Sequence, residues 1–212
     1  TLTAAEKVSG SGILGNEISD GVQLPLRDVM HLMIVVSDNT ATNMILERFT
    51  ADAVNAYLDR IGIRTTRSLR KVRGNGKQLK TAAGWSAAGK LPENEKYGLG
   101  VSSPREMVTL LDRLERGELV SAEASAEMIA VLKRCQGDTG IRRRFPGVPI
   151  ANKTGSLDTF RADVGIVYSK NGRIAMALAV EGIPKVDYGP DNLGSILIGD
   201  LAAILVDGLA KP

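Results

Sequence analysis

Two short clusters of polar side chains carry the chemistry that this sequence could perform. Ser37-Asp38-Asn39 ends an apolar run, and Lys153-Thr154-Gly155-Ser156 follows much later in the chain. A serine hydroxyl can hand a proton to a leaving nitrogen, and a lysine ammonium can attract a carboxylate. Gly155, within the second cluster, lets a ligand approach the backbone closely. The two clusters together could therefore bind an anionic amide and protonate its leaving group.

Each cluster alone is weak evidence for catalysis. A Ser-Asp-Asn or a Lys-Thr-Gly sequence occurs in many proteins as a turn or a helix cap. Asp38 is expected to be structural, because its short carboxylate can accept backbone N–H groups where a helix predicted over residues 40–49 begins. The clusters gain weight only because they occur together in a matching sequence context.

The sequence around both clusters resembles class A β-lactamases, which are penicillin-recognising serine hydrolases. The resemblance covers residues 26–43, around the first cluster, and residues 155–168, which follow the second. Residues 11–14, Ser-Gly-Ile-Leu, resemble the glycine-rich segment ahead of the family's Ser-Asp-Asn motif. The motifs thus follow the family's order and spacing over nearly the whole chain.

The resemblance implies an acyl-transfer site with a role for each residue. Ser37 and Lys153 would be catalytic, and the N–H near Ser156 would stabilise the oxyanion. Substrate contacts are implied for five residues: Asn39, Thr154, Gly155, Ser156 and Arg161. For Arg161 an alternative stays open, because an arginine at this position could instead tie down the turn that follows the motif.

The family's nucleophile, a serine in a Ser-x-x-Lys sequence ahead of Ser37, is not found in this chain. The Ser-x-x-Lys at residues 68–71 follows Ser37 and opens no helix, so we do not expect it to serve. We expect the nucleophile on an unseen segment or a second chain, which would also complete the sheet, and we expect the 212 residues alone to be inactive. A non-catalytic ligand-binding relative or fragment remains an alternative, as does an esterase or penicillin-binding peptidase of the same fold.

The base that would release the acyl group is also hard to find. Class A enzymes carry it in a Glu-x-x-x-Asn sequence, and residues 64–101 contain no such sequence. The acidic residues in this stretch are Glu93 and Glu95. We therefore expect slow release of product unless one of them takes this role.

Composition fits a compact enzyme that acts on a small molecule. Hydrophobic residues make up 43% of the chain, and the net charge of +3 gives no concentrated basic face for nucleic acid. One cysteine and one histidine, far apart in sequence, argue against a disulfide or a metal site, and no cofactor is expected. No apolar stretch is long enough to span a membrane. The family resemblance implies a periplasmic or secreted protein that acts on a β-lactam, acyl or peptide substrate.

The periodicity of the chain predicts an α+β fold, with a mostly helical domain at 1–149 and a domain of strands and a C-terminal helix at 150–212. Helices are predicted over residues 26–36, 40–49, 51–61, from 104 onward, 121–134 and 192–209. Strands are predicted over 150–154, 162–168 and 174–181, with a hairpin turn at Lys170-Asn171-Gly172. The resemblance implies a β-lactamase-like helical domain beside an antiparallel sheet covered by helices, and it places the missing N-terminal part in that sheet.

Overall fold

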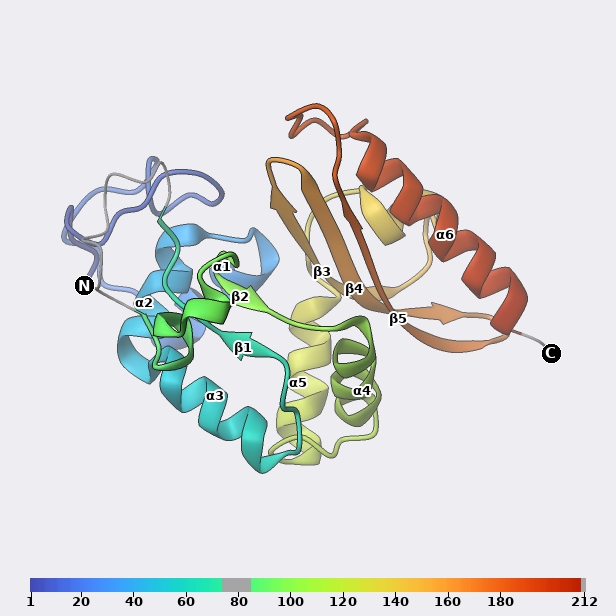
Figure 1. Ribbon diagram of the computed structural model, residues 1–212, viewed down its shortest axis with the longest axis horizontal. Helices are drawn as coiled ribbons and strands as arrows, with labels where there is room; N and C mark the ends of the chain where they lie inside the picture. The colour runs from blue at the N-terminus through green and yellow to red at the C-terminus, as the bar shows by residue number, and fades with distance from the viewer. Residues whose placement is uncertain (74–84, 211–212) are drawn as a thin grey trace. The chain divides into compact units, whose positions relative to one another are not determined.

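The computed structural model describes residues 1–73 and 85–210 (Figure 1). The chain forms two compact units that divide between Ser103 and Pro104. Helices and antiparallel sheets are both present, so the predicted α+β class is confirmed. The expected change from helices to strands at Ile150 lies inside the second unit. As a domain boundary, the division between 149 and 150 stays a prediction.

Three helices build the first unit and confirm the predicted ones to within two residues at each end. They are α1 (Leu26–Val35), α2 (Asn39–Phe49) and α3 (Ala51–Arg60). The helices α1 and α2 pack against each other, and the buried apolar side chains between them and the N-terminal segment are Leu2, Leu14, Val29 and Ala41. This core fixes the short connection between α1 and α2, which contains Ser37.

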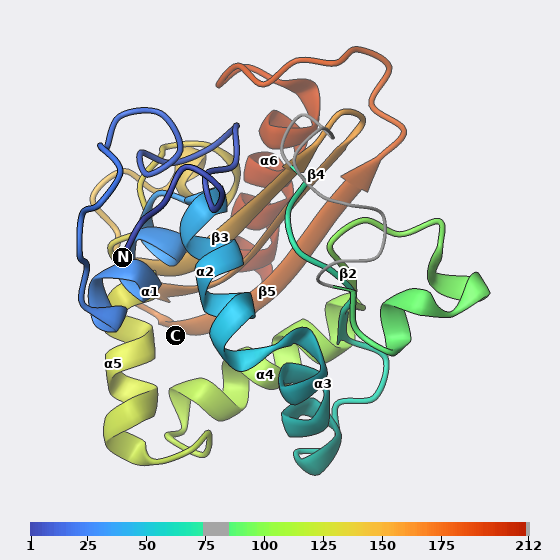
Figure 2. The ribbon, with the colours of Figure 1, turned by 90° about the vertical axis from the view of Figure 1, so that its left-hand side faces the viewer.

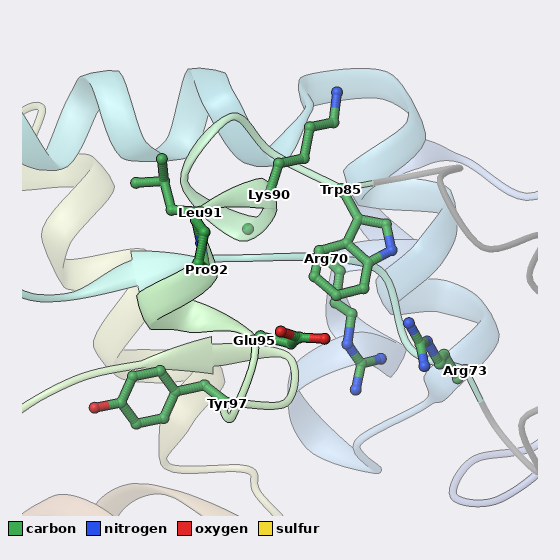
Figure 3. A pocket seen from close by; sticks show the side chains of 9 residues that line it. Arg70, Arg73, Trp85, Lys90, Leu91, Pro92, Glu95 and Tyr97 are labelled. Atoms are coloured by element: carbon green, nitrogen blue, oxygen red, sulfur yellow. The ribbon is translucent and has the colours of Figure 1, made fainter.

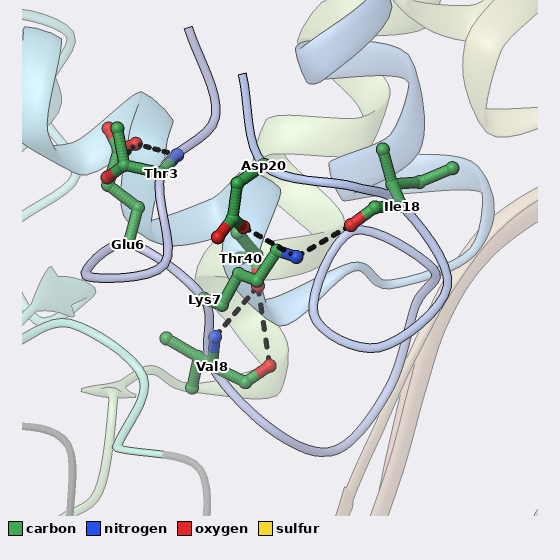
Figure 4. A network of polar contacts seen from close by, with 7 residues as sticks. All are labelled: Thr3, Glu6, Lys7, Val8, Ile18, Asp20 and Thr40. Carbon is green, nitrogen blue, oxygen red and sulfur yellow. Dashed lines mark hydrogen bonds and ion pairs between the residues drawn. The ribbon is translucent and has the colours of Figure 1, made fainter. Parts of the chain in front are cut away.

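The N-terminal segment, residues 1–25, has no regular secondary structure and is held by side chains instead. The Lys7 ammonium donates to the carbonyl of Ile18 at 2.6 Å and forms an ion pair of 2.8 Å with Asp20 (Figure 4). The backbone N–H of Leu2 donates to the carbonyl of Val22 at 2.8 Å. These contacts close the segment into a compact loop without a helix or strand.

The rest of the first unit is irregular, as the sequence predicts. Its described elements are β1 (Arg67–Ser68), η1 (Ala88–Lys90), η2 (Pro92–Asn94) and β2 (Gly100–Val101), and β1 pairs antiparallel with β2. Ser68, the serine of the Ser-x-x-Lys at residues 68–71, lies in strand β1, and the Asn55 side chain forms hydrogen bonds with both its N–H and its carbonyl. It does not lie on a helix.

The second unit is built on a three-stranded antiparallel sheet in the order β3-β4-β5. The strands are β3 (Ile150–Leu157), β4 (Phe160–Ser169) and β5 (Gly172–Glu181), and the hairpin predicted at residues 170–172 joins the last two. In the part of the chain that is described, β3 and β5 are both edges of this sheet. The unpaired edge expected from the sequence is therefore present.

Helices cover both faces of the sheet. The last helix, α6 (Leu193–Leu209), lies along one face (Figures 1 and 2), where Ile198 and Ala202 pack with Val167 of β4. The neighbouring Tyr168 points to the opposite face, and its hydroxyl donates at 2.5 Å to Glu115, the last residue of helix α4 (Pro104–Glu115). The predicted cover of the sheet by α6 is confirmed.

The remaining elements of the second unit are α4 (Pro104–Glu115), α5 (Ala122–Leu132) and η3 (Gly140–Arg144). The side chain of Arg142 anchors η3 to the sheet, because it donates to the Asn152 side chain at 2.8 Å and to a β3 carbonyl at 2.6 Å. None of the helices in residues 1–73 and 85–210 is long and apolar enough to cross a membrane.

Candidate active site

Ser37 lies in a strained turn between two helices. Its φ of 53° places it in the left-handed region, which is unfavourable for a residue with a Cβ by roughly 1–2 kcal/mol. The next residue, Asp38, donates its backbone N–H back to the carbonyl of Leu32 in α1 at 3.1 Å. The turn therefore joins α1 to α2 within a few residues and leaves Ser37 half-buried. Strained non-glycine residues of this kind concentrate at functional sites.

The Asp38 carboxylate holds this turn in place. The side chain is fully buried and caps α2 by accepting the N–H of Ala41 at 2.8 Å. Its other oxygen accepts the N–H groups of Ile13 and Leu14 at 2.7 and 2.8 Å. A Cβ on Gly12 would collide with this carboxylate, so only glycine fits there. The expected capping role of Asp38 is confirmed, and its bonds to the N-terminal loop are an additional finding.

Asn39 is bonded to the same loop. Its backbone N–H donates to the carbonyl of Ser11 at 3.0 Å, and its side-chain amide donates to the carbonyl of Ser9 at 2.9 Å. Gly10 has a φ of 106°, and a Cβ on it would lie 2.5 Å from that amide nitrogen. The glycine-rich sequence is therefore needed for the close approach between the loop and Asn39.

Thr40 completes the contact between the loop and α2. Its hydroxyl accepts the N–H of Val8 at 2.9 Å and donates to the Val8 carbonyl at 3.3 Å (Figure 4). Sequence reasoning did not assign a role to Thr40. Thr40 is fully buried, and a buried hydroxyl needs a hydrogen-bond partner, which Val8 supplies. Residues 8–14 are thus hydrogen-bonded to Asp38, Asn39 and Thr40, the residues that directly follow Ser37.

Lys153 lies on strand β3 of the second unit, where it pairs with Val164 of β4. Its ammonium is half-buried and donates to the carbonyl of Thr154 at 2.9 Å. Burial lowers the pKa of Lys153, while the neighbouring Cys135 and Asp163 act in the opposite direction. A lysine in such a setting is a proton donor or acceptor closer to neutral pH than a lysine in water.

Asp163 is the charged residue that sequence reasoning missed. It lies on β4 with 1% of its surface exposed and accepts hydrogen bonds from the N–H of Ile141 and the amide of Asn152, both at 2.9 Å. Burial raises its pKa to about 6, against the opposing effects of these bonds and of the cations Lys153 and Arg142. A single aspartate among the mostly apolar residues of this strand was the available signal.

Thr154, Gly155 and Ser156 continue β3 toward solvent. Thr154 is half-buried, and Gly155 and Ser156 are exposed. A Cβ on Gly155 would meet only the Ala162 methyl, at 4.0 Å, so packing within the described residues does not require a glycine there. An open strand backbone at this position is compatible with the ligand approach that the sequence suggests.

Arg161 is used by the protein itself. Its side chain is 3% exposed, and its guanidinium donates to the carbonyls of Leu157, Phe160 and Asp187, the Phe160 bond being 2.7 Å long. The guanidinium also lies 4.9 Å from the centre of the Tyr188 ring. This geometry favours the structural alternative, in which Arg161 ties down the turn after β3, over a contact with substrate.

The two motifs are each assembled locally, one in each unit. Ser37, Asp38 and Asn39 come together with the N-terminal loop in the first unit, and Lys153 comes together with Asp163 in the second. The joint action of Ser37 and Lys153 stays a prediction. Within the described ranges, no group of three or more His, Cys, Asp or Glu side chains is placed to hold a metal ion.

Comparison with known proteins agrees with the motifs. The model of the β-lactamase enzyme family matches residues 1–209. Among solved structures, β-lactamase from Sphaerobacter thermophilus is 32% identical with a TM-score of 0.77, over 100% of this chain and 73% of that one. The penicillin-binding protein PBP-A is 25% identical with a TM-score of 0.78, over 100% of this chain and 71% of that one. A class A β-lactamase from Mycobacterium abscessus, 21% identical over 99% of this chain and 74% of that one, shares the fold with a TM-score of 0.74.

A search of curated proteins found no match. The family match nevertheless covers almost every residue of the chain, including both motifs and the loop that packs on the first. The chain therefore belongs to the β-lactamase enzyme family.

Proposed function

We propose that this chain carries the Ser-Asp-Asn and Lys-Thr-Gly parts of a serine acyl-transfer site that opens β-lactams through an acyl-enzyme. The attacking serine and its lysine would come from a Ser-x-x-Lys segment outside these 212 residues. Attack on the amide carbonyl breaks the C–N bond, and the leaving nitrogen then needs a proton. In this proposal the hydroxyl of Ser37 delivers that proton and takes up in its place the proton that the lysine of the segment removed from the attacking serine.

The observation that carries the proposal is the way the fold holds Ser37. A strained φ of 53° persists because Asp38 is fixed by three backbone N–H groups. Such a support keeps the hydroxyl in one position during the reaction, which is what proton transfer requires. A turn with a merely structural role could place a glycine at this position at lower cost.

Lys153 supplies the positive charge in this proposal. Its half-buried ammonium would attract the carboxylate of the substrate and hold the Ser37 hydroxyl in position. Thr154 and Ser156 would donate hydrogen bonds to the same carboxylate, and the backbone N–H near Ser156 would face the oxyanion. Thr154 is half-buried and Ser156 is exposed at the end of β3, which leaves Ser156 accessible to a ligand.

A reporter penicillin followed by intact-mass measurement tests this proposal. The 212 residues alone should form no covalent adduct, whereas a form completed with the Ser-x-x-Lys segment should form one. In the completed form Lys153→Ala should slow acylation by roughly 10² to 10⁴, the usual range for a lost electrostatic or acid–base group. Lys170→Ala, which changes an exposed lysine in the β4–β5 turn, is the matched control. An adduct mapped to Ser37 or Ser68 of the chain alone, or an unchanged rate for Lys153→Ala, would contradict the proposal.

A penicillin-binding activity with slow turnover is the second candidate function. Residues 64–101 contain no Glu-x-x-x-Asn sequence, which favours this candidate. Release of the acyl group needs a water molecule that a nearby base activates, and this sequence would supply the base. The likeness to PBP-A points the same way. Burst kinetics on a chromogenic cephalosporin separate the two candidates. Fast steady turnover that Glu93→Gln or Glu95→Gln abolishes would identify a true β-lactamase.

Export from the cytoplasm is part of the same proposal, because a β-lactam-directed enzyme meets its substrate outside the inner membrane. Fractionation of cells that produce the natural full-length protein tests this directly. Recovery of the protein only with the cytoplasm would refute it.

A further inference from the structure

A cavity of about 710 Å³ opens in the first unit, between the end of β1 and the segment η1–η2 (Figure 3). None of the residues that line it belongs to the Ser-Asp-Asn or Lys-Thr-Gly motif. They are Arg70, Arg73, Trp85, Gly89, Lys90, Leu91, Pro92, Glu95 and Tyr97. A cavity of this volume is in the range that holds small-molecule ligands.

Two arginines gather on one aromatic ring in this cavity. The guanidinium carbons of Arg70 and Arg73 lie 5.8 and 5.2 Å from the centre of the Trp85 indole. Burial lowers the pKa of Arg70, and the neighbouring charge of Arg73 lowers it further. In the described part of the chain neither guanidinium forms an ion pair with a carboxylate. Two like charges so close together are stabilised when an anion binds between them.

The backbone fixes the indole and Arg70 relative to each other. Arg70 and Trp85 face each other in an antiparallel bridge, and the Ser86 N–H donates to the Leu69 carbonyl at 2.8 Å. A Cβ on Gly89 would collide with that carbonyl and approach the indole to 3.0 Å, so the segment η1 lies close against the bridge. Backbone contacts therefore hold Arg70 against the indole, which lowers the entropy lost when a ligand binds.

The opposite wall of the cavity is mostly apolar and aromatic. Leu91, Pro92 and Tyr97 are exposed apolar or aromatic side chains that line the same cavity. The Glu95 side chain extends from this wall toward the Trp85 indole, whereas the Lys90 ammonium points away from the indole (Figure 3). A ligand that satisfies both walls has an anionic group for the arginines and an apolar ring or chain for the other side. The Glu95 carboxylate would repel such an anion.

We propose that this cavity binds a phosphomonoester that carries an apolar or ring-shaped organic group, with the phosphate on Arg70 and Arg73 and the organic group against Leu91, Pro92 and Tyr97. Guanidinium forks match the oxygens of phosphate in pairs, and two of them balance its double charge better than the single charge of a carboxylate. The proposal goes beyond acyl transfer and does not depend on it, since it uses none of the motif residues.

Trp85 makes a direct test possible, because it is the only tryptophan in the chain. Phenyl phosphate, inorganic phosphate, benzoate and the neutral phenyl glucoside are titrated separately, and tryptophan fluorescence is recorded at constant ionic strength. Phenyl phosphate should give a saturable change at lower concentration than the other three. An equal response to benzoate would overturn the preference for phosphate, and an equal response to inorganic phosphate would overturn the role of the apolar wall.

Variants locate the binding site. Arg70→Gln and Arg73→Gln should each weaken phenyl phosphate binding about tenfold or more, as expected when a charged hydrogen-bond donor is lost. Glu95→Gln should strengthen binding, an effect that misfolding could not produce. Arg105→Gln, which changes an exposed arginine of α4, is the control and should leave binding unchanged. Unchanged affinity in both cavity arginine variants, or weaker binding in a folded Glu95→Gln variant, would overturn the proposal.

Discussion

Replacing Asp38 with asparagine tests how the first motif is held. The substitution keeps the shape of the side chain but turns one of its two acceptor oxygens into an NH2 group. Because the carboxylate accepts N–H groups from Ile13, Leu14 and Ala41, the new NH2 group must face at least one of these donors. A buried N–H left without an acceptor costs roughly 1–3 kcal/mol, and loss of charge weakens each remaining bond by about 1 kcal/mol. The free energy of unfolding should therefore fall by roughly 3–5 kcal/mol.

Urea unfolding followed by Trp85 fluorescence measures this change, because Trp85 lies in the same compact unit as Asp38. Asp28→Asn is the matched control, since Asp28 is exposed in the first turn of α1. We expect that control to change stability by less than about 1 kcal/mol. If Asp38→Asn and Asp28→Asn differ by less than about 0.5 kcal/mol, the carboxylate does not hold the turn and our reading of the site is wrong.

Two further predictions concern stability. The pKa of Asp163, raised from 3.8 to about 6 in the folded chain, means that the folded state binds this proton more tightly than the unfolded state. Stability relative to Asp163→Asn should therefore be greatest below about pH 4, fall as the pH rises from about 4 to about 6, by up to roughly 3 kcal/mol in total, and stay level above that, in unfolding followed by circular dichroism. A difference that does not vary with pH would refute this. Gly12→Ala should destabilise the chain by at least about 1 kcal/mol more than Gly21→Ala in thermal unfolding, because both glycines have positive φ but only Gly12 packs against Asp38. Equal losses would show that the collision is relieved at little cost.

Much of the fold could be predicted because its signals are local. Helix α1 follows from apolar residues at helical spacing, α2 from the cap at Asp38, and the β4–β5 hairpin from Asn171-Gly172. The three strands of the second unit were predicted at the right places but shorter than they are. Their extra residues depend on pairing with neighbours, which a single strand does not reveal.

The parts that escaped prediction depend on contacts between distant residues. The segment η3 is held by the bond of its Arg142 to Asn152 of β3 and by the bond of its Ile141 N–H to Asp163 of β4. Neither contact leaves a periodic pattern in the sequence. Strands β1 and β2 have two residues each, too few for any alternation to show. Similarly, the two open roles of Arg161 could be weighed only once its guanidinium was seen against three carbonyls.

The backbone of Ser37 also affects how this chain should be engineered. Methods that raise stability by relieving unfavourable torsion angles would replace a residue at a φ of 53° with glycine. That change would remove the hydroxyl while leaving the helices, the cap at Asp38 and the glycine-rich loop intact. A variant chosen for heat resistance could then fold better than the parent and lack the group on which the proposed chemistry depends. Position 37 should therefore be kept fixed in any stabilised library of this protein.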